Sequence, residues 1–558
     1  MARVLIGFSL IIVAFIVILF RLFYWQVYAG ESLRLQASAQ YYLEFTLPAA
    51  RGDITASDGN PLVMNTPAYL VYAQPKFIKD TVQFAKLVSG PLGLDEKTVI
   101  SELSEEGRIW EPLARKIDTE TVDLLRLLKL EGLDFEPESK RYYPEASMAA
   151  HALGFVGSDQ NGNDKGYFGL EGYYDRELRG TDGHIQIEKD VRGAPIVIGG
   201  EKRTGAENGR SLGLWIDRTI QRIAEKRLSE GIAKYGAKEG SVVIMDPKTG
   251  GILAMASIPS YDPLRYGSYD KALYKNPVVA GSYEPGSTFK VLVMAAALNE
   301  RAVQATTVMD ETGPVQVGDY TIKTWNDEYH GAQTMMDVIA HSSNVGMVFV
   351  GKKLGREKFI KYIRSFGFGK PTDVDLEDEI SPELRRDNEW GEIDLATASF
   401  GQGIAVTPLQ MTRAVSVIAN GGWLPEPRMV RKTIDAKGKV IEIKPKQGKR
   451  IISRQAAEIT TEMMIHAVDN GEAKWAKPKG YRIAGKTGTA QIPVSGHYDN
   501  TKTIASFVGF APADDPSFVM LVSLREPSTS QWGSETAAPL FFSIARDILL
   551  YKGIAPQP

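Results

Sequence analysis

The feature that most constrains the fold is an apolar run at the amino terminus. Residues 4–20 carry no charged side chain. As a helix this run is about 26 Å long, and in lipid a segment must satisfy its own backbone polar groups. Leu22-Phe-Tyr-Trp25 extends it past Arg21, whose long side chain can reach the membrane interface beside the aromatic rings. The sequence therefore predicts a transmembrane helix.

A cleaved signal peptide is the competing interpretation of this segment. Val27-Tyr-Ala29 loosely fits a small-x-small cleavage site. The apolar core is longer than that of a usual signal peptide and bulky aromatic residues follow it, which favours a retained anchor. Arg3 and the amino terminus on one side face Arg21 and Arg34 on the other. The positive-inside rule alone therefore decides the orientation only weakly.

Length and composition exclude several classes of function. At 558 residues the chain has room for more than one core, and length alone suggests about two to four domains. The formal net charge of −3 gives no electrostatic basis for binding nucleic acid. The chain has no cysteine, which excludes disulfides, thiolate catalysis and cysteine-bound zinc.

The region before residue 236 combines short β-like runs, amphipathic helices and turns. Asp58-Gly59 predicts a tight turn or hairpin. Residues 119–130 have the helical spacing of a segment that buries one face.

Two acidic segments invite comparison with calcium loops. Residues 159–164 and 373–379 both lack the glycine required at the sixth loop position. At the twelfth position, where a bidentate glutamate is needed, they have Leu170 and Leu384. We expect solvent-exposed loops and no metal site.

A possible nucleophile lies in the stretch Glu284-Pro-Gly-Ser-Thr-Phe-Lys290, which precedes the Ala- and Leu-rich residues 291–298. Ser287 is favourable at a helix start, so Ser287 and Lys290 are expected one turn apart on one helix face. A lysine can accept the serine proton only while its amine is neutral. That state requires burial or a nearby cation to lower its pKa. An ordinary helix start with an exposed lysine is the alternative.

A Ser-Ser-Asn turn, residues 342–344, lies between predicted helices at residues 335–340 and 345–354. Taken alone, this tripeptide is a common turn sequence. His341 precedes it, but the chain contains no G-x-S-x-G sequence. We therefore expect His341 to be structural or exposed to solvent.

Residues 480–487 match the phosphate-loop sequence G-x-x-x-x-G-K-[ST] letter for letter. That motif requires a buried strand before it and a helix that begins at the Lys-Thr pair. Here the preceding residues 472–479 are polar and interrupted by proline, and residues 488–493 are a poor helix start. The context predicts a strand instead of a nucleotide site.

In such a strand, Lys486 and Gly488 point to one face, and Thr487 and Thr489 point to the other, unless a bulge at Gly488 changes the register. The missing side chain of Gly488 would allow a substrate backbone to approach closely. Other segments of the region that carries these motifs are a predicted hairpin at residues 240–246 and 251–257, a second hairpin at residues 503–511 and 517–524, and a final helix at residues 534–550. Together with the strand at Lys486 they give the order strand–strand, helices, strand–strand–strand, helix, which is typical of the α+β class.

Three motifs in this order resemble the S-x-x-K, S-x-N and K-T-G set of penicillin-binding proteins and serine β-lactamases. They are Ser287-Thr-Phe-Lys290, Ser342-Ser-Asn344 and Lys486-Thr-Gly488. Further segments resemble class B penicillin-binding proteins, and the resemblance covers nearly the whole chain. These segments are Arg51-Gly-Asp-Ile54, Gly169-Leu-Glu-Gly-Tyr-Tyr-Asp175 and Phe400-Gly-Gln-Gly-Ile-Ala-Val-Thr-Pro-Leu-Gln410.

The resemblance implies an α+β protein with four parts. These are a cytoplasmic tail (1–3), a transmembrane anchor (4–25), an elongated mixed α/β pedestal resembling a dimerisation domain (26–235), and a transpeptidase domain (236–558). The last is expected to be an antiparallel five-stranded sheet flanked by helices.

The resemblance also implies catalytic roles. Ser287 would be the nucleophile and Lys290 its general base. Ser342 would relay a proton to or from the leaving amine, and Asn344 would orient Lys290 and the substrate amide. Lys486 would supply a positive field that helps to keep Lys290 neutral.

The remaining implied roles concern substrate binding. Thr487 and Thr489 would hold the terminal carboxylate of a peptide that lies along the strand past Gly488. Backbone N–H groups of Ser287 and Thr489 would form the oxyanion hole that acyl transfer requires.

The activity implied is a D,D-transpeptidase outside the cytoplasmic membrane, with the amino terminus inside. It would join stem peptides of peptidoglycan, a D-Ala-D-Ala donor and an amine acceptor, in cell-wall elongation or division. It would need no cofactor and would be acylated by β-lactams. The resemblance suggests, as a partner, an integral-membrane glycan polymerase of the shape, elongation and division family.

Other activities share parts of this pattern. A D,D-carboxypeptidase has the same motifs and differs in accepting water. A membrane-anchored β-lactam sensor or a non-catalytic cell-wall scaffold is a further alternative. A class A β-lactamase would need Glu-x-x-Leu-Asn between the second and third motifs, and a bifunctional class A penicillin-binding protein would need Glu-Asp-x-x-Phe-x-x-His. The chain contains neither sequence.

Overall fold

The structure of the chain is a computed structural model. The structure describes residues 1–34, 42–105, 107–160, 162–189, 201–446, 448–494 and 497–557. The fold divides into two compact units. The smaller contains Met1–Arg51 and Arg179–Gly209, and the larger contains Gly52–Leu178 and Arg210–Pro558.

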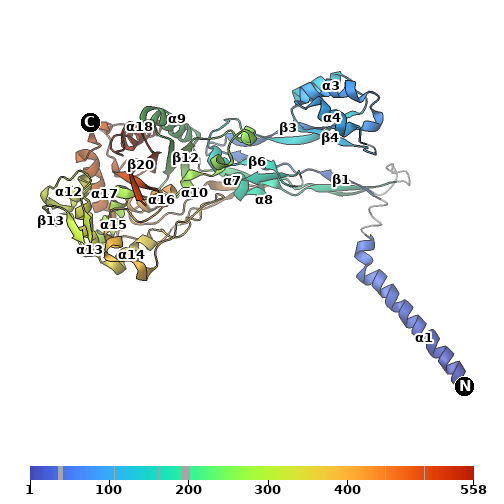
Figure 1. Cartoon of the computed structure of the whole chain (residues 1–558), viewed down its shortest axis with the longest axis horizontal. Helices are drawn as coiled ribbons and strands as arrows, with labels where there is room; N and C mark the ends of the chain where they lie inside the picture. Colours follow the sequence, from blue (N-terminus) through green and yellow to red (C-terminus); the bar gives the residue numbers. More distant parts are fainter. Residues whose placement is uncertain are drawn as a thin grey trace. The chain divides into compact units, whose positions relative to one another are not determined.

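The smaller unit begins with the predicted apolar helix (Figure 1). Helix α1 (Ala2–Phe23) continues into the π-helical turn η1 (Tyr24–Tyr28). Over Ala2–Tyr28 it is long and apolar enough to cross a membrane, and its most apolar window is not covered by protein. The guanidinium of Arg21 lies 5.1 Å from the centroid of the Trp25 ring, as expected for an interfacial end. The helix fits a single-pass membrane anchor.

The smaller unit also contains a three-stranded antiparallel sheet in the order β1-β8-β9. Its strands come from two separate parts of the chain. They are β1 (Tyr42–Leu47), β8 (Gly183–Glu188) and β9 (Glu201–Thr204).

A seven-stranded sheet in the larger unit draws on distant parts of the chain. The strand order is β18-β17-β10-β2-β3-β4, and β5 pairs with β3. The predicted turn at Asp58-Gly59 joins β2 to β3. The strands are β2 (Ile54–Thr55), β3 (Pro61–Ala73), β4 (Glu111–Ile117), β5 (Leu133–Tyr142), β10 (Ser211–Leu214), β17 (Val430–Ile434) and β18 (Val440–Glu442).

Helices α3 (Thr81–Leu92), α4 (Glu96–Leu103) and α5 (Thr119–Leu127) share a small core with β3, β4 and β5. The carboxylate of Asp118 caps α5 by accepting a hydrogen bond from the backbone N–H of Thr121. The helix predicted at residues 119–130 is thus confirmed, but it ends earlier.

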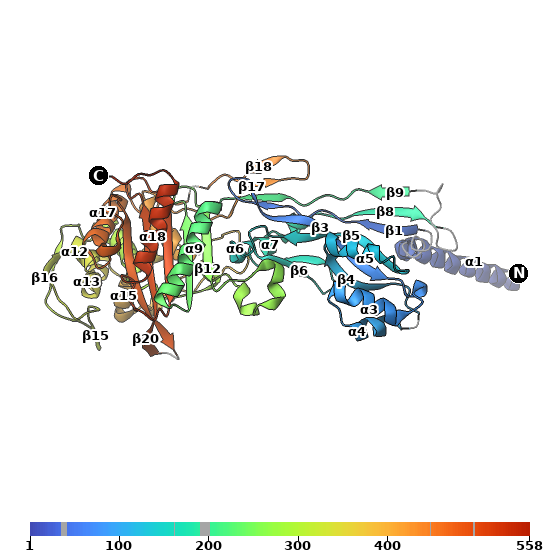
Figure 2. The same cartoon turned by 90° about the horizontal axis from the view of Figure 1, so that it is seen from above.

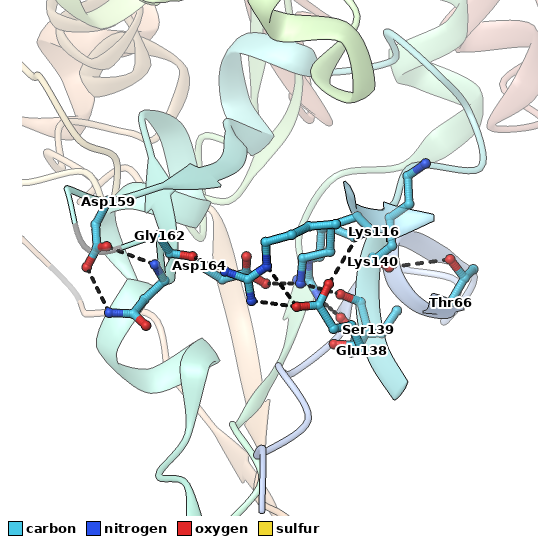
Figure 3. Close-up of polar contacts among 12 residues, drawn as sticks. Thr66, Lys116, Glu138, Ser139, Lys140, Asp159, Gly162 and Asp164 are labelled. Atoms are coloured by element: carbon cyan, nitrogen blue, oxygen red, sulfur yellow. Dashed lines mark hydrogen bonds and ion pairs between the residues drawn. The ribbon is translucent and has the colours of Figure 1, made fainter. Parts of the chain in front are cut away.

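The first acidic loop connects β6 (Phe155–Ser158) and β7 (Asp164–Tyr167). Figure 3 shows how its carboxylates are used. Asp159 accepts a hydrogen bond of 2.9 Å from the backbone N–H of Asn163, and Asp164 lies 2.9 Å from the amine of Lys116. Asn161 lies outside the described residues. The described carboxylates are engaged in a loop contact and an ion pair.

In the second acidic segment Asp373, Glu377 and Asp378 are exposed, as expected of a solvated loop, but Asp375 is not. Asp375 is only 4 % exposed. Its carboxylate accepts hydrogen bonds from the backbone N–H groups of Met429 and Val430 and from the hydroxyl of Tyr174. These donors satisfy the carboxylate in place of water, so Asp375 joins three chain segments that are distant in sequence.

The catalytic-type motifs lie around a second, five-stranded sheet, in the order β12-β11-β21-β20-β19. Every neighbouring pair is antiparallel, as expected. The strands are β11 (Glu239–Met245), β12 (Ile252–Ile258), β19 (Ala484–Val494), β20 (His497–Ala511) and β21 (Phe518–Arg525).

Helices cover both faces of this sheet (Figure 2). Helices α9 (Arg218–Tyr235) and α18 (Ala537–Tyr551) lie side by side over one face. Val242 belongs to their core, whereas Val243 belongs to the core of the opposite face. This alternation explains why the strands have few polar residues, because both faces are buried. The whole of α9 precedes the predicted domain boundary at 236, which stays a prediction.

The other face is covered by α11 (Lys290–Asn299), α16 (Pro408–Ala419) and α17 (Arg454–Asn470). Shorter elements surround them. They are α6 (Ala150–Leu153), α7 (Gly169–Tyr173), α8 (Asp175–Arg179), α10 (Pro277–Ala280), α12 (Met335–Ala340), α13 (Asn344–Leu354), α14 (Arg356–Ser365), α15 (Glu392–Ser399), β13 (Val308–Glu311), β14 (Val315–Val317), β15 (Tyr320–Ile322) and β16 (Gly331–Thr334).

Candidate active site

Ser287 lies on a tight turn that leads into the central helix. It is half-buried in the 3-10 turn η5 (Gly286–Phe289), which continues directly into α11. Gly286 has a φ of +53° and Gly401 a φ of +84°. The N–H of Gly286 donates to the carbonyl of Gly401 at 3.0 Å. A Cβ on Gly401 would lie 2.1 Å from the carbonyl oxygen of Gly286, so only glycine permits this contact.

Lys290 occupies the first turn of α11 and is completely buried. Its amine donates to the backbone carbonyl of Ser342 at 2.5 Å and to the side-chain oxygen of Asn344 at 2.8 Å. The Ser342 hydroxyl lies 3.3 Å from the same nitrogen. The structure thus brings together the first and second predicted motifs around one amine.

The electrostatics favour a neutral Lys290. Burial, followed by the charge of Lys486, holds the pKa of Lys290 well below its usual range, against the effects of Glu472 and Glu311. A neutral amine has two N–H donors and one lone pair. The carbonyl of Ser342 and the Asn344 oxygen can accept both donors, which leaves the lone pair for a serine hydroxyl.

Lys486 is also buried, with 3 % of its surface exposed. Burial lowers the pKa of Lys486 to about 8, and the Glu472 carboxylate opposes this effect. At neutral pH Lys486 therefore remains mostly charged, and its charge favours the neutral form of Lys290.

The backbone of the second motif is unusual. Ser342 has a φ of +57° between α12 and α13. Ser343 caps α13, because its hydroxyl oxygen accepts from the N–H of Gly346 at 2.8 Å. The Ser343 hydroxyl donates to Glu311, a fully buried carboxylate on β13. Gln333 also donates to Glu311. The buried Glu311 carboxylate therefore fixes the Ser342-Ser343 turn through its hydrogen bond with Ser343.

The third motif lies on β19, at the edge of the five-stranded sheet. Lys486 and Gly488 are buried while Thr487 and Thr489 are partly exposed, which confirms the predicted alternation. Gly488 allows a different close approach from the one expected. A Cβ there would lie 2.7 Å from Cγ2 of Thr288 and 3.1 Å from the carbonyl oxygen of Pro285. The glycine therefore lets η5 pack against β19.

The hydroxyl oxygens of Thr487 and Thr489 each accept a hydrogen bond. The hydroxyl oxygen of Thr487 accepts from the Lys486 amine at 3.1 Å. The hydroxyl oxygen of Thr489 accepts from the N–H of Gly533 at 3.0 Å. Each hydroxyl can still donate its proton, which suits the recognition of an anion.

A cleft of about 320 Å³ opens over these residues. Its lining includes members of all three motifs. The motif residues are Ser287, Ser342, Asn344, Thr487, Gly488 and Thr489. Lys290 and Lys486 lie beneath the lining surface, because both are buried. The structure therefore gathers every site residue predicted from the sequence around one cleft.

Sequence reasoning missed several residues here. Trp325 and Trp532 line the cleft and form an edge-to-face pair with ring centroids 4.7 Å apart. Glu472 lines the same cleft and acts electrostatically on both lysines. Glu311 and Gly401 belong to this set of missed residues. Single aromatic or acidic residues outside a motif give no sequence signal, although Gly401 lies within one segment that carried the resemblance.

His341 is exposed, and its ring lies tilted by 31° against that of His330, with the centroids 4.1 Å apart. The expectation of a structural or solvent-facing side chain is confirmed. Within the described ranges, no group of three or more His, Asp or Glu side chains has the arrangement of a metal site.

Comparisons with known proteins agree with this geometry. Residues 240–549 match the penicillin-binding protein transpeptidase domain, and residues 46–214 match the penicillin-binding protein dimerisation domain. Stage V sporulation protein D of Bacillus subtilis is 35 % identical over 98 % of this chain and 85 % of its own length. Peptidoglycan D,D-transpeptidase FtsI of Escherichia coli is 31 % identical over 98 % of this chain and 91 % of its own length.

A solved structure shows the same fold. Penicillin-binding protein 3 of Mycobacterium tuberculosis, in complex with aztreonam, superposes with a TM-score of 0.71 at 27 % identity. The match covers 92 % of this chain and 98 % of that one.

Proposed function

Because this chain belongs to the class B penicillin-binding proteins, we propose that it is a membrane-anchored peptidoglycan D,D-transpeptidase acting through an acyl-enzyme on Ser287. The observation that carries this assignment is the state of Lys290. Its amine is fully buried, is bonded to both Ser342 and Asn344, and has a strongly lowered pKa. A neutral lysine one turn from a serine is the base that acyl transfer requires.

In the first half-reaction, Ser287 Oγ attacks the carbonyl carbon of the penultimate D-alanine of the donor peptide. Its proton passes to the lone pair of Lys290. The tetrahedral intermediate then collapses, the C–N bond to the terminal D-alanine breaks, and a proton reaches the leaving amine through the Ser342 hydroxyl. The N–H groups of Ser287 and Thr489 would stabilise the oxyanion.

Recognition of the donor would rest on its terminal carboxylate. The hydroxyls of Thr487 and Thr489 both retain a proton to donate, and the charge of Lys486 lies beneath them. The peptide backbone would lie along the edge strand β19, as an added strand. The same groups would hold the carboxylate of a β-lactam, which opens its ring on Ser287 to give a stable ester.

In the second half-reaction, the amine of another stem peptide attacks the Ser287 ester and completes the cross-link. The alternative acceptor is water, which would make the protein a D,D-carboxypeptidase. The tryptophan pair favours the first outcome, because Trp325 and Trp532 give the cleft an apolar border that a peptide covers better than water does.

The anchor supports a place at the cytoplasmic membrane. We also propose that residues 1–3 lie in the cytoplasm and that residues 26–235 form the pedestal. The catalytic domain, residues 236–558, would lie outside the cytoplasmic membrane. An integral-membrane glycan polymerase of the shape, elongation and division family is the proposed partner, because new cross-links require new glycan strands at the membrane.

A donor pentapeptide ending in D-Ala-D-Ala tests the activity. The full-length protein in detergent is incubated with the donor and a D-amino acid acceptor, and mass spectrometry follows the acyl-enzyme, released D-alanine, and the exchanged and hydrolysed peptides. We expect an acyl adduct on Ser287 and more exchanged than hydrolysed product. Ser287→Ala should abolish the adduct, whereas Ser282→Ala, at an exposed serine on the same segment, should not. Adduct formation by Ser287→Ala would refute the assignment.

A further inference from the structure

Of the described residues that line the catalytic cleft, Glu472 alone has a charged side chain. Lys290 and Lys486 lie beneath the lining surface, because both are buried. Glu472 itself is exposed, and it makes no hydrogen bond or ion pair with another described residue. No base therefore neutralises this carboxylate, and its charge acts on the groups around it.

The backbone fixes Glu472 beside the second and third motifs. Helix α17, which ends two residues before Glu472, packs against both α12 and β19, the strand of Lys486. A Cβ on Gly471 would lie 2.3 Å from the carbonyl oxygen of Ala467 and 3.1 Å from that of Ala340. Because a side chain does not fit at position 471 without a shift, the glycine lets the chain leave α17 this close to the end of α12.

Lys486 is a buried cation without a direct ion pair. Its amine donates to the hydroxyl oxygen of Thr487 at 3.1 Å and contacts no carboxylate of the described chain. A small cavity of about 10 Å³ is lined by Lys486, Thr487 and Glu472. Glu472 supplies the one carboxylate among the described residues of this lining. A buried ammonium stays charged more readily with a carboxylate nearby, and Glu472 occupies that place.

The other carboxylates of the neighbouring elements already have partners. Those of α17 form three ion pairs, Glu458 with Arg454, Glu462 with Arg482 and Asp469 with Lys477. On α12, Asp337 caps its own helix, and His341 and His466 act on it. Glu311 of β13 accepts two hydrogen bonds. Among these described carboxylates, only that of Glu472 has no partner.

Few other charges surround Lys486. Residues 503–511 of β20 and all of η5, which also pack against β19, have no charged side chain. Lys290 of α11 is the second buried lysine, and the charge of Lys486 acts on it. Burial lowers the pKa of Lys486, and the carboxylate of Glu472 opposes this effect. The charge of Lys486 therefore depends on Glu472.

From its place in the cleft, its lack of a partner and the cavity that it shares with Lys486, we propose that Glu472 is a positioning residue for acylation. Its carboxylate is the counter-charge that keeps Lys486 positive, and it thereby sets the alkaline limit of the reaction. The inference rests on the proposed function, in which Lys486 attracts the carboxylate of the donor. A negative charge stabilises an ammonium, so without it Lys486 becomes neutral at a lower pH.

The pH dependence of acylation tests this role. The second-order rate constant for a fluorescent penicillin is measured on the full-length protein in detergent, and its value at about pH 8.5 is divided by that at about pH 6.5. Glu472→Gln should lower this ratio about two- to fivefold, the effect of one exposed charge. The rate constant at the lower pH should not fall, because Lys486 is still charged and the loss of the carboxylate favours neutral Lys290.

Two further variants serve as controls. Glu472→Asp keeps the charge and should keep the ratio of the unmodified protein. Glu458→Gln removes a carboxylate that is paired with Arg454 and lies outside the cleft lining, so its ratio should also be unchanged. The same ratio in Glu472→Gln and the unmodified protein would overturn the proposal. A structural defect that lowers the rate constant equally at both pH values gives this result.

Thermal unfolding gives a second readout that needs no acylation. The attraction between Glu472 and Lys486 is present below about pH 8, where Lys486 is charged, and is lost above it. At about pH 6.5, Glu472→Gln should therefore lower the melting temperature of the unmodified protein but not that of Lys486→Met, and at about pH 9.5 it should lower neither. Equal effects in the two backgrounds at the lower pH would overturn the proposal. A protein that does not react with penicillin would refute the proposed function, and the melting temperatures would still decide the role of Glu472.

Discussion

The amine of Lys290 donates a 2.8 Å hydrogen bond to the side-chain oxygen of Asn344. Asn344 is itself held, because its amide donates to the carbonyl of Lys323 at 3.0 Å. Asn344, the first residue of α13, thereby fixes the direction of the Lys290 amine. Because an amide oxygen accepts a hydrogen bond without adding charge, it orients the lysine while leaving its lowered pKa intact.

Replacing that oxygen by a charged one gives the first prediction. In Asn344→Asp, a carboxylate beside the amine should raise the pKa of Lys290. The fraction of neutral lysine at pH 7 falls, so acylation by a fluorescent penicillin should slow about tenfold for each pH unit by which this pKa comes to exceed 7. Raising the pH should bring the rate of the variant toward that of the unmodified protein at the same pH, since Lys290 loses its proton again.

The control for this experiment is Asn326→Asp, which adds the same charge at an asparagine bonded to Glu328 instead. Its profile of acylation rate against pH should match that of the unmodified protein. A deficit in Asn344→Asp that persists at high pH would indicate structural damage and contradict the role of Asn344.

The lowered pKa of Lys486 gives the second prediction. Below pH 8 this lysine is charged, and as the pH rises through about 8 it becomes neutral. The carboxylate of the substrate then loses its positive partner, so the second-order rate constant of acylation should fall on the alkaline side, with an apparent pKa near 8. The arginine in Lys486→Arg stays charged at every accessible pH. The acylation rate constant of this variant should therefore show no alkaline fall, even if the rate constant is lower at every pH. The same alkaline fall in the arginine variant would assign it to another group.

The residues predicted for the site lie together at one cleft, and their signals in the sequence are local. Ser287 and Lys290 are one helical turn apart, and the helix periodicity around residues 342–344 places that turn between α12 and α13. The context of Lys486 correctly favoured a strand over a nucleotide-binding loop. Each of these predictions depended on only a few neighbouring residues.

Residues that act across the fold were not predictable in this way. Asp375 looked like part of a solvated acidic loop, but its hydrogen-bond donors are Tyr174 and the start of β17. Trp325 and Trp532 meet only because two loops converge at the cleft. A side chain at position 488 would meet Thr288 and Pro285 at η5, a contact that the sequence did not indicate. In each case the partner is distant in sequence.

The third prediction concerns Glu311, which the structure places under the Ser342 turn. Its carboxylate accepts hydrogen bonds from Ser343 and Gln333 in a fully buried site. Glu311→Ala leaves both donors buried without a partner and should lower the free energy of unfolding by about 3 kcal/mol. Thermal unfolding measures this effect. The control is Glu328→Ala, which removes a carboxylate bonded only to the nearby Asn326 in the described structure. This variant should change the free energy of unfolding by less than about 0.5 kcal/mol. Equal effects of the two variants would contradict the role assigned to Glu311.

The last prediction concerns the glycine behind the nucleophile. A Cβ at position 401 would lie 2.1 Å from the Gly286 carbonyl oxygen, whereas at Gly403 its nearest neighbour is Oγ1 of Thr397, at 3.4 Å. Both glycines have positive φ, +84° and +71°, so alanine at either position carries a similar backbone cost of about 1–2 kcal/mol. Only Gly401→Ala must also displace the turn that carries Ser287. A misplacement of about 1 Å in a catalytic group can cost about a hundredfold in rate, so Gly401→Ala should acylate about a hundredfold more slowly than Gly403→Ala. Equal acylation rates in the two variants would show that the contact between Gly401 and Gly286 does not position the nucleophile.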